Sequence, residues 1–209
     1  MLTLNCASCG AAVNFHSKAS VFAVCSFCKS TLVRQDMNLD VIGSMADLQD
    51  DYSPLQIGTQ GLYEGKKFEI VGRLKVAYDG GFWHEWFTWF DTDTTGWLAA
   101  AQGFLAMCFT VEDLVPASEN LKPGTVLPLK GRAFQVDDIR QAHCVYSEGE
   151  LPINAVKGRQ ALSVDLSGKD AQMATIEYPA DNSKPRIFVG TYQDFDQFKF
   201  KNLRKLDGW

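Results

Sequence analysis

Four cysteines near the amino terminus carry the strongest chemical signal in this sequence. They form two C-x2-C pairs, Cys6 with Cys9 and Cys25 with Cys28, separated by a 15-residue gap. Zn²⁺ prefers four tetrahedral thiolate ligands, and each short pair aims two sulfurs at one centre. The spacing therefore predicts a zinc ribbon with one ion. Two redox dithiols or two local disulfides would not explain two pairs spaced for a single centre.

The ion is expected to be structural. A shell of four cysteines leaves no open coordination position for water or substrate. The ribbon, residues 1–35, is too short to bury a core unaided, so metal binding should contribute much of its folding free energy. The ribbon carries Lys18, Lys29 and Arg34 and no acid. Four thiolates around one Zn²⁺ offset most of that positive charge, so no nucleic-acid binding is expected.

An aromatic run, Phe82–Phe90, is the second feature that could do chemistry. Both of its faces would be apolar on a strand, which predicts a central strand buried on each side. An acid among indoles can attract an ammonium group, because aromatic faces favour cations and a carboxylate neutralises them. The candidate ligand-binding residues are Trp83, Glu85, Trp86 and Trp97.

Other interpretations of these residues remain open. Glu85 could pair with Arg73 on a neighbouring strand, with His84 hydrogen-bonded in the core. The aromatic side chains could instead anchor a protein interface. An enzyme is a further hypothesis, in which Glu85, Glu148 or Glu150 would perform acid–base chemistry. The two later cysteines, Cys108 and Cys144, are expected to be buried thiols rather than nucleophiles.

The elements that must position these residues are mainly β. Runs rich in β-branched or aromatic residues are separated by turn residues, and convincing helical periodicity is absent after residue 54. The predicted strands are 67–78, 82–91, 104–111, 133–139, 161–166 and 171–178. Asp79-Gly80-Gly81 predicts a hairpin turn between the first two. We expect a small four-cysteine zinc ribbon followed by a β-barrel or β-sandwich-like domain.

The charge pattern divides the chain into three parts. Residues 36–53 are rich in aspartate and are expected to form an acidic linker between the ribbon and a mainly β domain at 54–209. A faint repeat at an offset of 66 residues favours either duplication of a β unit or coincidental turn chemistry. It matches Leu55, Gly58, Thr59, Gly65 and Phe68 with Leu121, Gly124, Thr125, Gly131 and Phe134.

Composition excludes several classes of protein. Hydrophobic content of 46% and charged content of 22% are those of a globular chain. A net charge of −5 argues against a general binder of nucleic-acid phosphates. No apolar run approaches the roughly 20 residues of a spanning helix, and residues 1–15 lack the pattern of a secretory signal. A cytoplasmic location, where thiols stay reduced, is expected.

The order and spacing of short motifs in residues 54–200 resemble the bacterial domain of unknown function 4178 family, whose members often carry an amino-terminal zinc ribbon. The motifs are Pro54-Leu55, Ile57-Gly58-Thr59, Gly61, Gly65, Phe68, Gly72-Arg73, Trp83, Glu85-Trp86, Gly96-Trp97-Leu98 and Glu148-Gly149-Glu150-Leu151-Pro152. The family has no established activity. The resemblance implies a non-enzymatic adaptor linked to envelope stress, with phage-shock protein A-like membrane-remodelling proteins as partners. A sensor of polyamine-like cations is the alternative.

Overall fold

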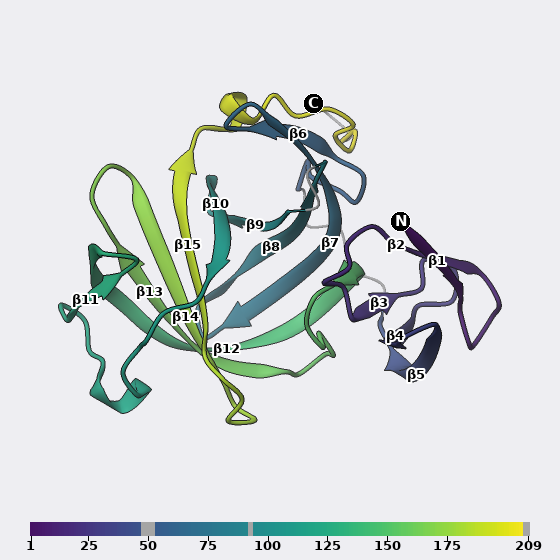
Figure 1. Cartoon of the computed structure of the whole chain (residues 1–209), viewed down its shortest axis with the longest axis horizontal. Helices are drawn as coiled ribbons and strands as arrows, with labels where there is room; N and C mark the ends of the chain where they lie inside the picture. The colour runs from purple at the N-terminus through teal and green to yellow at the C-terminus, as the bar shows by residue number, and fades with distance from the viewer. Residues whose placement is uncertain (47–52, 92–93, 207–209) are drawn as a thin grey trace.

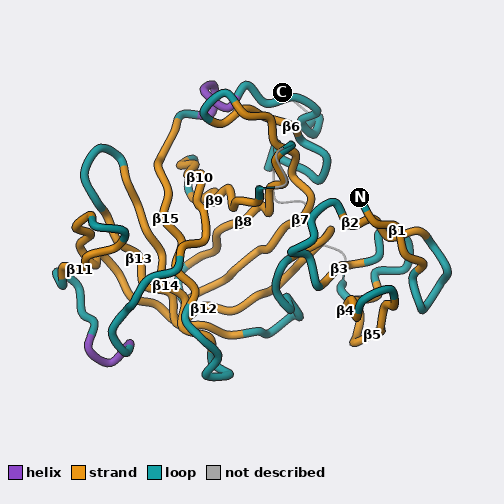
Figure 2. Tube along the Cα trace, in the orientation of Figure 1, coloured by secondary structure: helices purple, strands orange, loops and turns teal. Residues whose placement is uncertain are grey.

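The computed structural model describes residues 1–46, 53–91 and 94–206, and these residues form strands, two short 3₁₀ helices and no α-helix (Figures 1 and 2). Eight of the strands make a closed antiparallel ring in the order β7-β8-β9-β10-β15-β14-β13-β12, which the pairing of β12 with β7 completes. Their bounds are β7 Lys66–Tyr78, β8 Gly81–Phe90, β9 Thr95–Ala101, β10 Phe104–Val111, β12 Arg132–Leu151, β13 Gln160–Ser167, β14 Gln172–Pro179 and β15 Arg186–Gln193. The mainly β prediction is confirmed, and the domain is a barrel.

The barrel consists of two similar halves, each a hairpin followed by three more strands. Strand β6 (Gln60–Tyr63) pairs with β7 as β11 (Val126–Leu129) pairs with β12. The backbone N–H of Gly58 donates to Ile70 at 2.8 Å, and that of Gly124 donates to Val136 at the same distance. Both β7 and β12 then carry an irregularity in register immediately after these acceptor residues. The sequence repeat therefore corresponds to a repeated local geometry.

Each half also has an apolar cluster on the outside of the ring. In the first half, β6 and the carboxyl-terminal segment around the 3₁₀ helix Phe195–Phe198 cover Trp86 and Leu98. In the second half, β11 and the segment before it cover Val164 and Ile176. Because these layers shield the outer faces, the ring strands are buried on both sides. This explains why the aromatic run is apolar on each face.

The cysteine-bearing segment joins the barrel sheet. Strands β1 (Leu2–Asn5) and β2 (Ala12–Phe15) form a separate hairpin, whereas β3 (Phe22–Val24), β4 (Ser30–Gln35) and β5 (Asn38–Ser44) extend the large sheet. Val24 of β3 is paired with Gly149 of β12. The linker predicted at 36–53 is therefore wrong over 38–44, which pair with β4. Residues 47–52 of that prediction lie outside the described part of the chain.

Several strand predictions need correction in extent. The strand predicted at 133–139 is the first part of β12, which continues through Leu151. Strands β9 and β15 were not predicted. The alanines of β9 weaken its β signal, whereas the Ile, Phe, Val, Thr and Tyr of β15 were a usable signal that the prediction missed. The hairpin turn between β7 and β8 is confirmed, with Gly80 at a φ of 111° that L-residues avoid. Within the described residues, no helix is long and apolar enough to cross a membrane.

Candidate functional site

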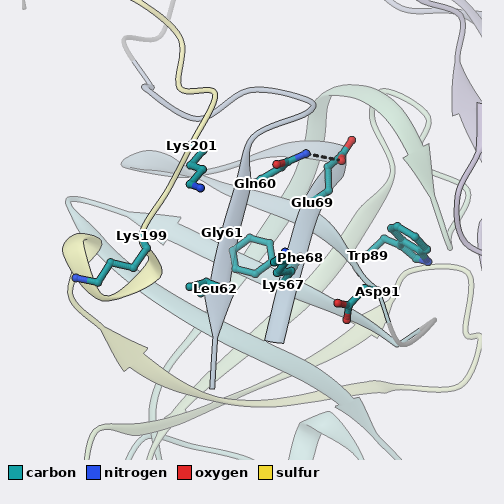
Figure 3. Close-up of a pocket in the computed structure, with 10 residues that line it drawn as sticks. All are labelled: Gln60, Gly61, Leu62, Lys67, Phe68, Glu69, Trp89, Asp91, Lys199 and Lys201. Carbon is teal, nitrogen blue, oxygen red and sulfur yellow. Dashed lines mark hydrogen bonds between the residues drawn. The ribbon is translucent and has the colours of Figure 1, made fainter. Parts of the chain in front are cut away.

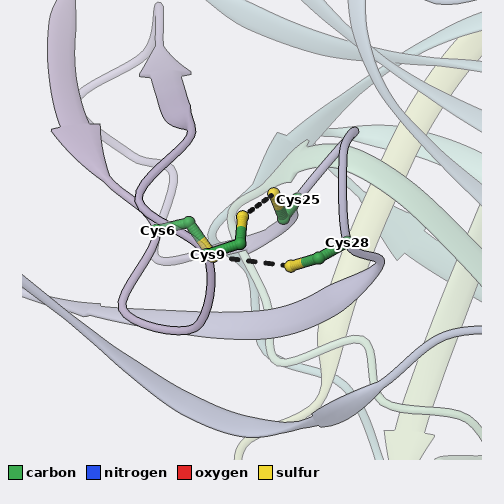
Figure 4. A group of neighbouring side chains, drawn as sticks. All are labelled: Cys6, Cys9, Cys25 and Cys28. Atoms are coloured by element: carbon green, nitrogen blue, oxygen red, sulfur yellow. Dashed lines mark hydrogen bonds between the residues drawn. The ribbon is translucent and has the colours of Figure 1, made fainter.

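The four predicted metal ligands converge on one point (Figure 4). Their Sγ atoms all lie within 4.8 Å of one another. The sulfurs of Cys6 and Cys28 are 3.7 Å apart, as are those of Cys9 and Cys25. Four sulfurs at 2.3 Å from a tetrahedral Zn²⁺ would lie about 3.8 Å apart. The donor set and its spacing therefore fit a tetrahedral metal ion.

The same backbone turn presents each pair of thiols. The N–H of Gly10 donates to the carbonyl of Cys6 at 2.8 Å, and the N–H of Lys29 donates to that of Cys25 at 3.0 Å. Gly10 and Lys29 both have positive φ, 78° and 59°. Glycine suits this conformation and lysine does not, so the second turn retains it at a cost in strain. Two matched turns place four sulfurs around one centre.

One of these thiols is prepared for ionisation before any metal binds. The Sγ of Cys28 lies 3.2 Å from the hydroxyl oxygen of Ser30. Hydrogen bonds from the Ser30 side chain and backbone lower the pKa of the Cys28 thiol to about 6. Metal ions bind the thiolate form, so this environment favours ligation near neutral pH.

The second site is a cavity of about 370 Å³ inside the barrel. All eight ring strands contribute side chains to its wall, so the cavity is the lumen of the ring. Three of the four predicted cation-binding residues, Trp83, Glu85 and Trp97, line it together. Phe188 packs against Trp97 with ring centroids 6.3 Å apart and adds a further aromatic wall. Three of the four candidate residues therefore face one cavity inside the closed ring.

The fourth predicted residue, Trp86, does not line the lumen. Alternate side chains of a strand point to opposite faces, and Trp86 lies fully buried in the outer apolar cluster. The guanidinium of Arg73 sits 4.5 Å from the centroid of its ring. Trp86 therefore belongs to a cation–π contact within the protein, not to the cavity.

The predicted pairing of Arg73 with Glu85 is also wrong. Arg73 faces outward with Trp86, where it lies 3.6 Å from the Glu148 carboxylate and 3.3 Å from a ring nitrogen of His84. Burial and the charge of Arg73 lower the pKa of His84 to about 3, which keeps this imidazole neutral. The prediction that His84 is hydrogen-bonded in the core is confirmed. Glu85 faces the lumen instead of Arg73.

Carboxylates dominate the charged groups of the lumen wall. Glu85, Asp165 and Glu177 line the cavity with a single guanidinium, that of Arg140. Arg140 pairs with Asp138 and lies 4.6 Å from the ring centroid of Tyr78. Arg186 pairs with Glu177 from outside the lumen, so the acidic character of the wall rests on Glu85 and Asp165.

Each of the three acids is anchored by a specific donor. Trp83 Nε1 donates to Glu85 at 2.8 Å, and the hydroxyl of Thr175 donates to Asp165 at 3.1 Å. Arg186 Nη2 donates to Glu177 at 2.6 Å. These contacts hold the carboxylates in fixed directions around the cavity, a geometry that is prepared for a ligand.

Burial shifts the ionisation of the lumen acids. Desolvation raises the pKa of Glu85 and of Asp165 above their usual values. Desolvation and the nearby Glu85 carboxylate raise the pKa of Glu177. Because these acids share one cavity, ionising one makes the next proton harder to remove. A bound cation would relieve this repulsion.

The carboxylates of the enzyme hypothesis do not share a site. Glu85 faces the lumen, Glu148 contacts Arg73 outside the ring, and the buried Glu150 accepts hydrogen bonds from the backbone and ring nitrogens of His16, both at 2.7 Å. Acid–base chemistry on one substrate needs groups that converge on it. The separation of these three residues removes the geometric basis for that hypothesis.

The two later cysteines are buried, as predicted. Cys108 lines the lumen, where its Sγ lies 3.2 Å from the sulfur of Met173. Burial raises the pKa of the Cys108 thiol to about 12 and that of Cys144 to about 11. A thiol with such a pKa is a poor nucleophile near neutral pH.

Sequence reasoning missed two lumen acids, Asp165 and Glu177. They lie on β13 and β14, whose other lumen-lining residues are Ser163, Met173 and Thr175. An acid at an inward position of a predicted strand was a usable signal. Burying a carboxylate is energetically unfavourable, so its presence there indicates a specific partner or a site. The strand-to-strand register that brings them opposite Glu85 was not readable from the sequence.

A third hollow lies outside the ring, between β6, β7, β8 and the carboxyl-terminal segment (Figure 3). It has a volume of about 280 Å³ and is lined by acids as well as lysines. Gln60 donates to Glu69 at 3.2 Å across its wall. The lysines Lys199 and Lys201 stand on the carboxyl-terminal segment. None of the residues predicted from the sequence to bind a ligand lines it.

Comparison with known proteins gives one match. A family model described as "Domain of unknown function (DUF4178)" matches residues 56–195. No curated protein and no solved structure matches the chain. The matched range contains every residue that lines the lumen, and the four-cysteine cluster precedes it.

Proposed function

This chain belongs to the family of domain of unknown function DUF4178, and from that premise and the geometry of its lumen we propose that the barrel is a non-enzymatic binding module for a small organic cation. The observation that carries the proposal is the combination of indole walls and carboxylates in one cavity. Trp83 and Trp97 offer aromatic faces. Glu85 lies on β8 with Trp83, and Trp97 lies on the adjacent strand β9. Ammonium groups favour both partners, most strongly where water is excluded.

The spacing of the acids favours an organic amine over a metal ion. In the described residues, only the four cysteines form a group of metal-ligating atoms close enough to hold one ion. Glu85, Asp165 and Glu177 are thus too dispersed for a common ion, whereas a flexible amine with separated nitrogens can reach more than one of them. The cavity volume of about 370 Å³ accommodates a molecule of that size.

Fluorescence titration with spermidine tests the proposal. Two of the lumen residues are tryptophans, so a bound amine should change the emission in a saturable way. Glu85→Gln removes the central carboxylate and should weaken binding by at least about tenfold, a typical loss for a charged partner in a desolvated site. Glu119→Gln removes an exposed acid outside the lumen and is the matched control. A flat titration at millimolar spermidine would overturn the proposal.

For the cysteine centre, we propose that the bound ion is structural Zn²⁺. The support is the four-thiolate donor set with near-tetrahedral sulfur spacing, which soft-ligand chemistry assigns to zinc or iron. Elemental analysis of protein purified without added metal should give one zinc per chain. Stoichiometric iron with visible absorption, or no metal, would contradict this assignment.

A second candidate function is docking to a protein through the ribbon, as an adaptor would require. Strand β5 ends the large sheet and carries exposed Val41 and Ile42, and Phe27, between β3 and β4, is 78% exposed. An edge strand with apolar side chains can pair with a strand of another protein. Pull-down with a phage-shock protein A-like protein tests this. Ile42→Asp should abolish capture, with the exposed lumen-mouth variant Phe104→Asp as control.

A further inference from the structure

The floor of the barrel lumen is built from one acid and two arginines. Arg186 donates to Oε2 of Glu177 through Nε at 3.0 Å and through Nη2 at 2.6 Å. Arg159 Nη2 lies 3.9 Å from the same oxygen. Glu177 lines the lumen above, whereas both arginines line a different cavity below. The cluster therefore separates two cavities.

The lower cavity lies between the barrel and the ribbon. Its volume is about 660 Å³, and its wall includes Val21 of the ribbon. The N–H of Val21 donates to the carbonyl of Leu151 at 3.0 Å, which holds the ribbon against this end of the barrel. The loop after β12 and the turn between β14 and β15 supply the remaining wall. Such a cavity is large enough for a small metabolite.

The wall of this cavity carries two guanidinium groups and one exposed carboxylate, that of Asp181. Two partly buried guanidinium groups, with side chains 19% and 22% exposed, share one carboxylate. Arg159 Nη2 is buried and has no hydrogen-bond partner. A buried donor without an acceptor is unfavourable, and a charged donor more so. Asp181 accepts the backbone N–H of Ser183 at 2.9 Å, and this contact together with the charge of Arg159 lowers the pKa of its carboxyl.

We propose that this lower cavity binds a phosphate group through Arg159 and Arg186. Guanidinium groups recognise oxyanions by parallel N–H···O bonds, and two of them at one cavity wall match a dianion. The phosphate would bind beside guanidinium groups that share a single buried carboxylate, that of Glu177. The cavity is far larger than inorganic phosphate, so it has room for the organic part of a phosphate monoester. This inference stands independently of cation binding in the lumen.

NMR of the full chain with its metal tests the site. The Arg159 and Arg186 Nε–H signals should shift saturably with inorganic phosphate, and glycerol phosphate should bind more tightly if the organic part is accommodated. Arg159→Gln should weaken binding by about tenfold or more, as loss of a charge-assisted pair does. Lys157→Gln removes an exposed charge two residues away and should leave affinity within about twofold.

The alternatives give distinct results. Equal binding by inorganic phosphate and glycerol phosphate would restrict the site to the free ion, and tighter binding of the monoester would assign it to phosphorylated metabolites. If Arg159→Gln does not fold, Arg159→Lys keeps the charge but not the planar fork and should still lower affinity. Absence of Arg159 and Arg186 shifts at 10 mM phosphate, or equal affinity in Arg159→Gln and Lys157→Gln, would overturn the proposal.

Discussion

At the scale of single residues, the ionisable groups explain which interactions are fixed and which await a ligand. His84 has its pKa lowered to about 3 and serves as a neutral neighbour of Arg73. Glu150 is satisfied by His16. Glu85, by contrast, is desolvated, and its one hydrogen bond between side chains comes from a neutral indole, that of Trp83. Its carboxylate is therefore the group that a cation would stabilise most.

The raised pKa of Glu85 predicts a pH-dependent stability. A carboxyl whose pKa is higher in the folded chain holds its proton there after the unfolded chain has lost it, so stability falls as pH rises above the unfolded value of 4.5. Glu85→Gln should therefore have a higher Tm than the wild type at pH 8, and the difference should vanish near pH 4. Thermal melts of both proteins measure this. A lower Tm for the variant at pH 8 would contradict it.

At the scale of elements, strand β12 connects the two halves of the barrel and the ribbon. Its twenty residues pair with β11, β13, β7 and β3, so one strand joins both halves of the barrel and the ribbon. Gly149 makes this possible. It has a φ of 69°, and a Cβ there would lie 2.2 Å from the Val71 carbonyl oxygen. No other residue type fits so close to backbone.

We expect Gly149→Ala to destabilise the chain by about 3 kcal/mol or more, because strain at positive φ and a backbone clash add together. Gly131→Ala is the matched control. Gly131 has a similar φ of 73° and open space around its Cβ position, so its substitution should cost only about 1 kcal/mol. Urea unfolding gives both values. Equal losses in the two variants would show that the close approach of β12 to β7 does not matter.

The sequence was informative about elements and less so about their register. Neighbouring residues of a strand point to opposite faces, so Glu85 and Trp86 could not share the one candidate site in which both were placed. The repeat marked the two hairpins, since the same turn needs the same glycines. Closure of the ring through β12 and β7, and the placement of Asp165 and Glu177 opposite Glu85, depend on long-range pairing that no local pattern records.

At the scale of the whole molecule, the ribbon and the barrel are one continuous structure. Val24 of β3 is paired with Gly149, and His16 of the ribbon is bound to the buried Glu150 of the barrel. The four-cysteine spacing predicted that the four thiols converge, because ligand geometry is local. The expectation of a separating linker failed over 38–44, because aspartates do not prevent a short edge strand from pairing with β4.

Metal removal should consequently affect more than the ribbon. We expect a chelator to lower the Tm of the whole chain by about 10 °C or more, because the ordering of β3 to β5 depends on the metal and β3 completes the pairing of β12. Unfolding followed by far-UV circular dichroism and by tryptophan fluorescence should give the same midpoint. A tryptophan transition that keeps its midpoint after chelation would indicate two independent modules.

Binding of an amine in the lumen is decided by a crystal structure of the metal-loaded chain with spermidine. Density for the amine should lie inside the ring, with one nitrogen in contact with the Glu85 carboxylate and its carbon chain against Trp83 and Trp97. A lumen that holds only water at saturating spermidine, or an amine bound solely on the outer surface, would contradict the assignment of the barrel as a binding module for organic cations.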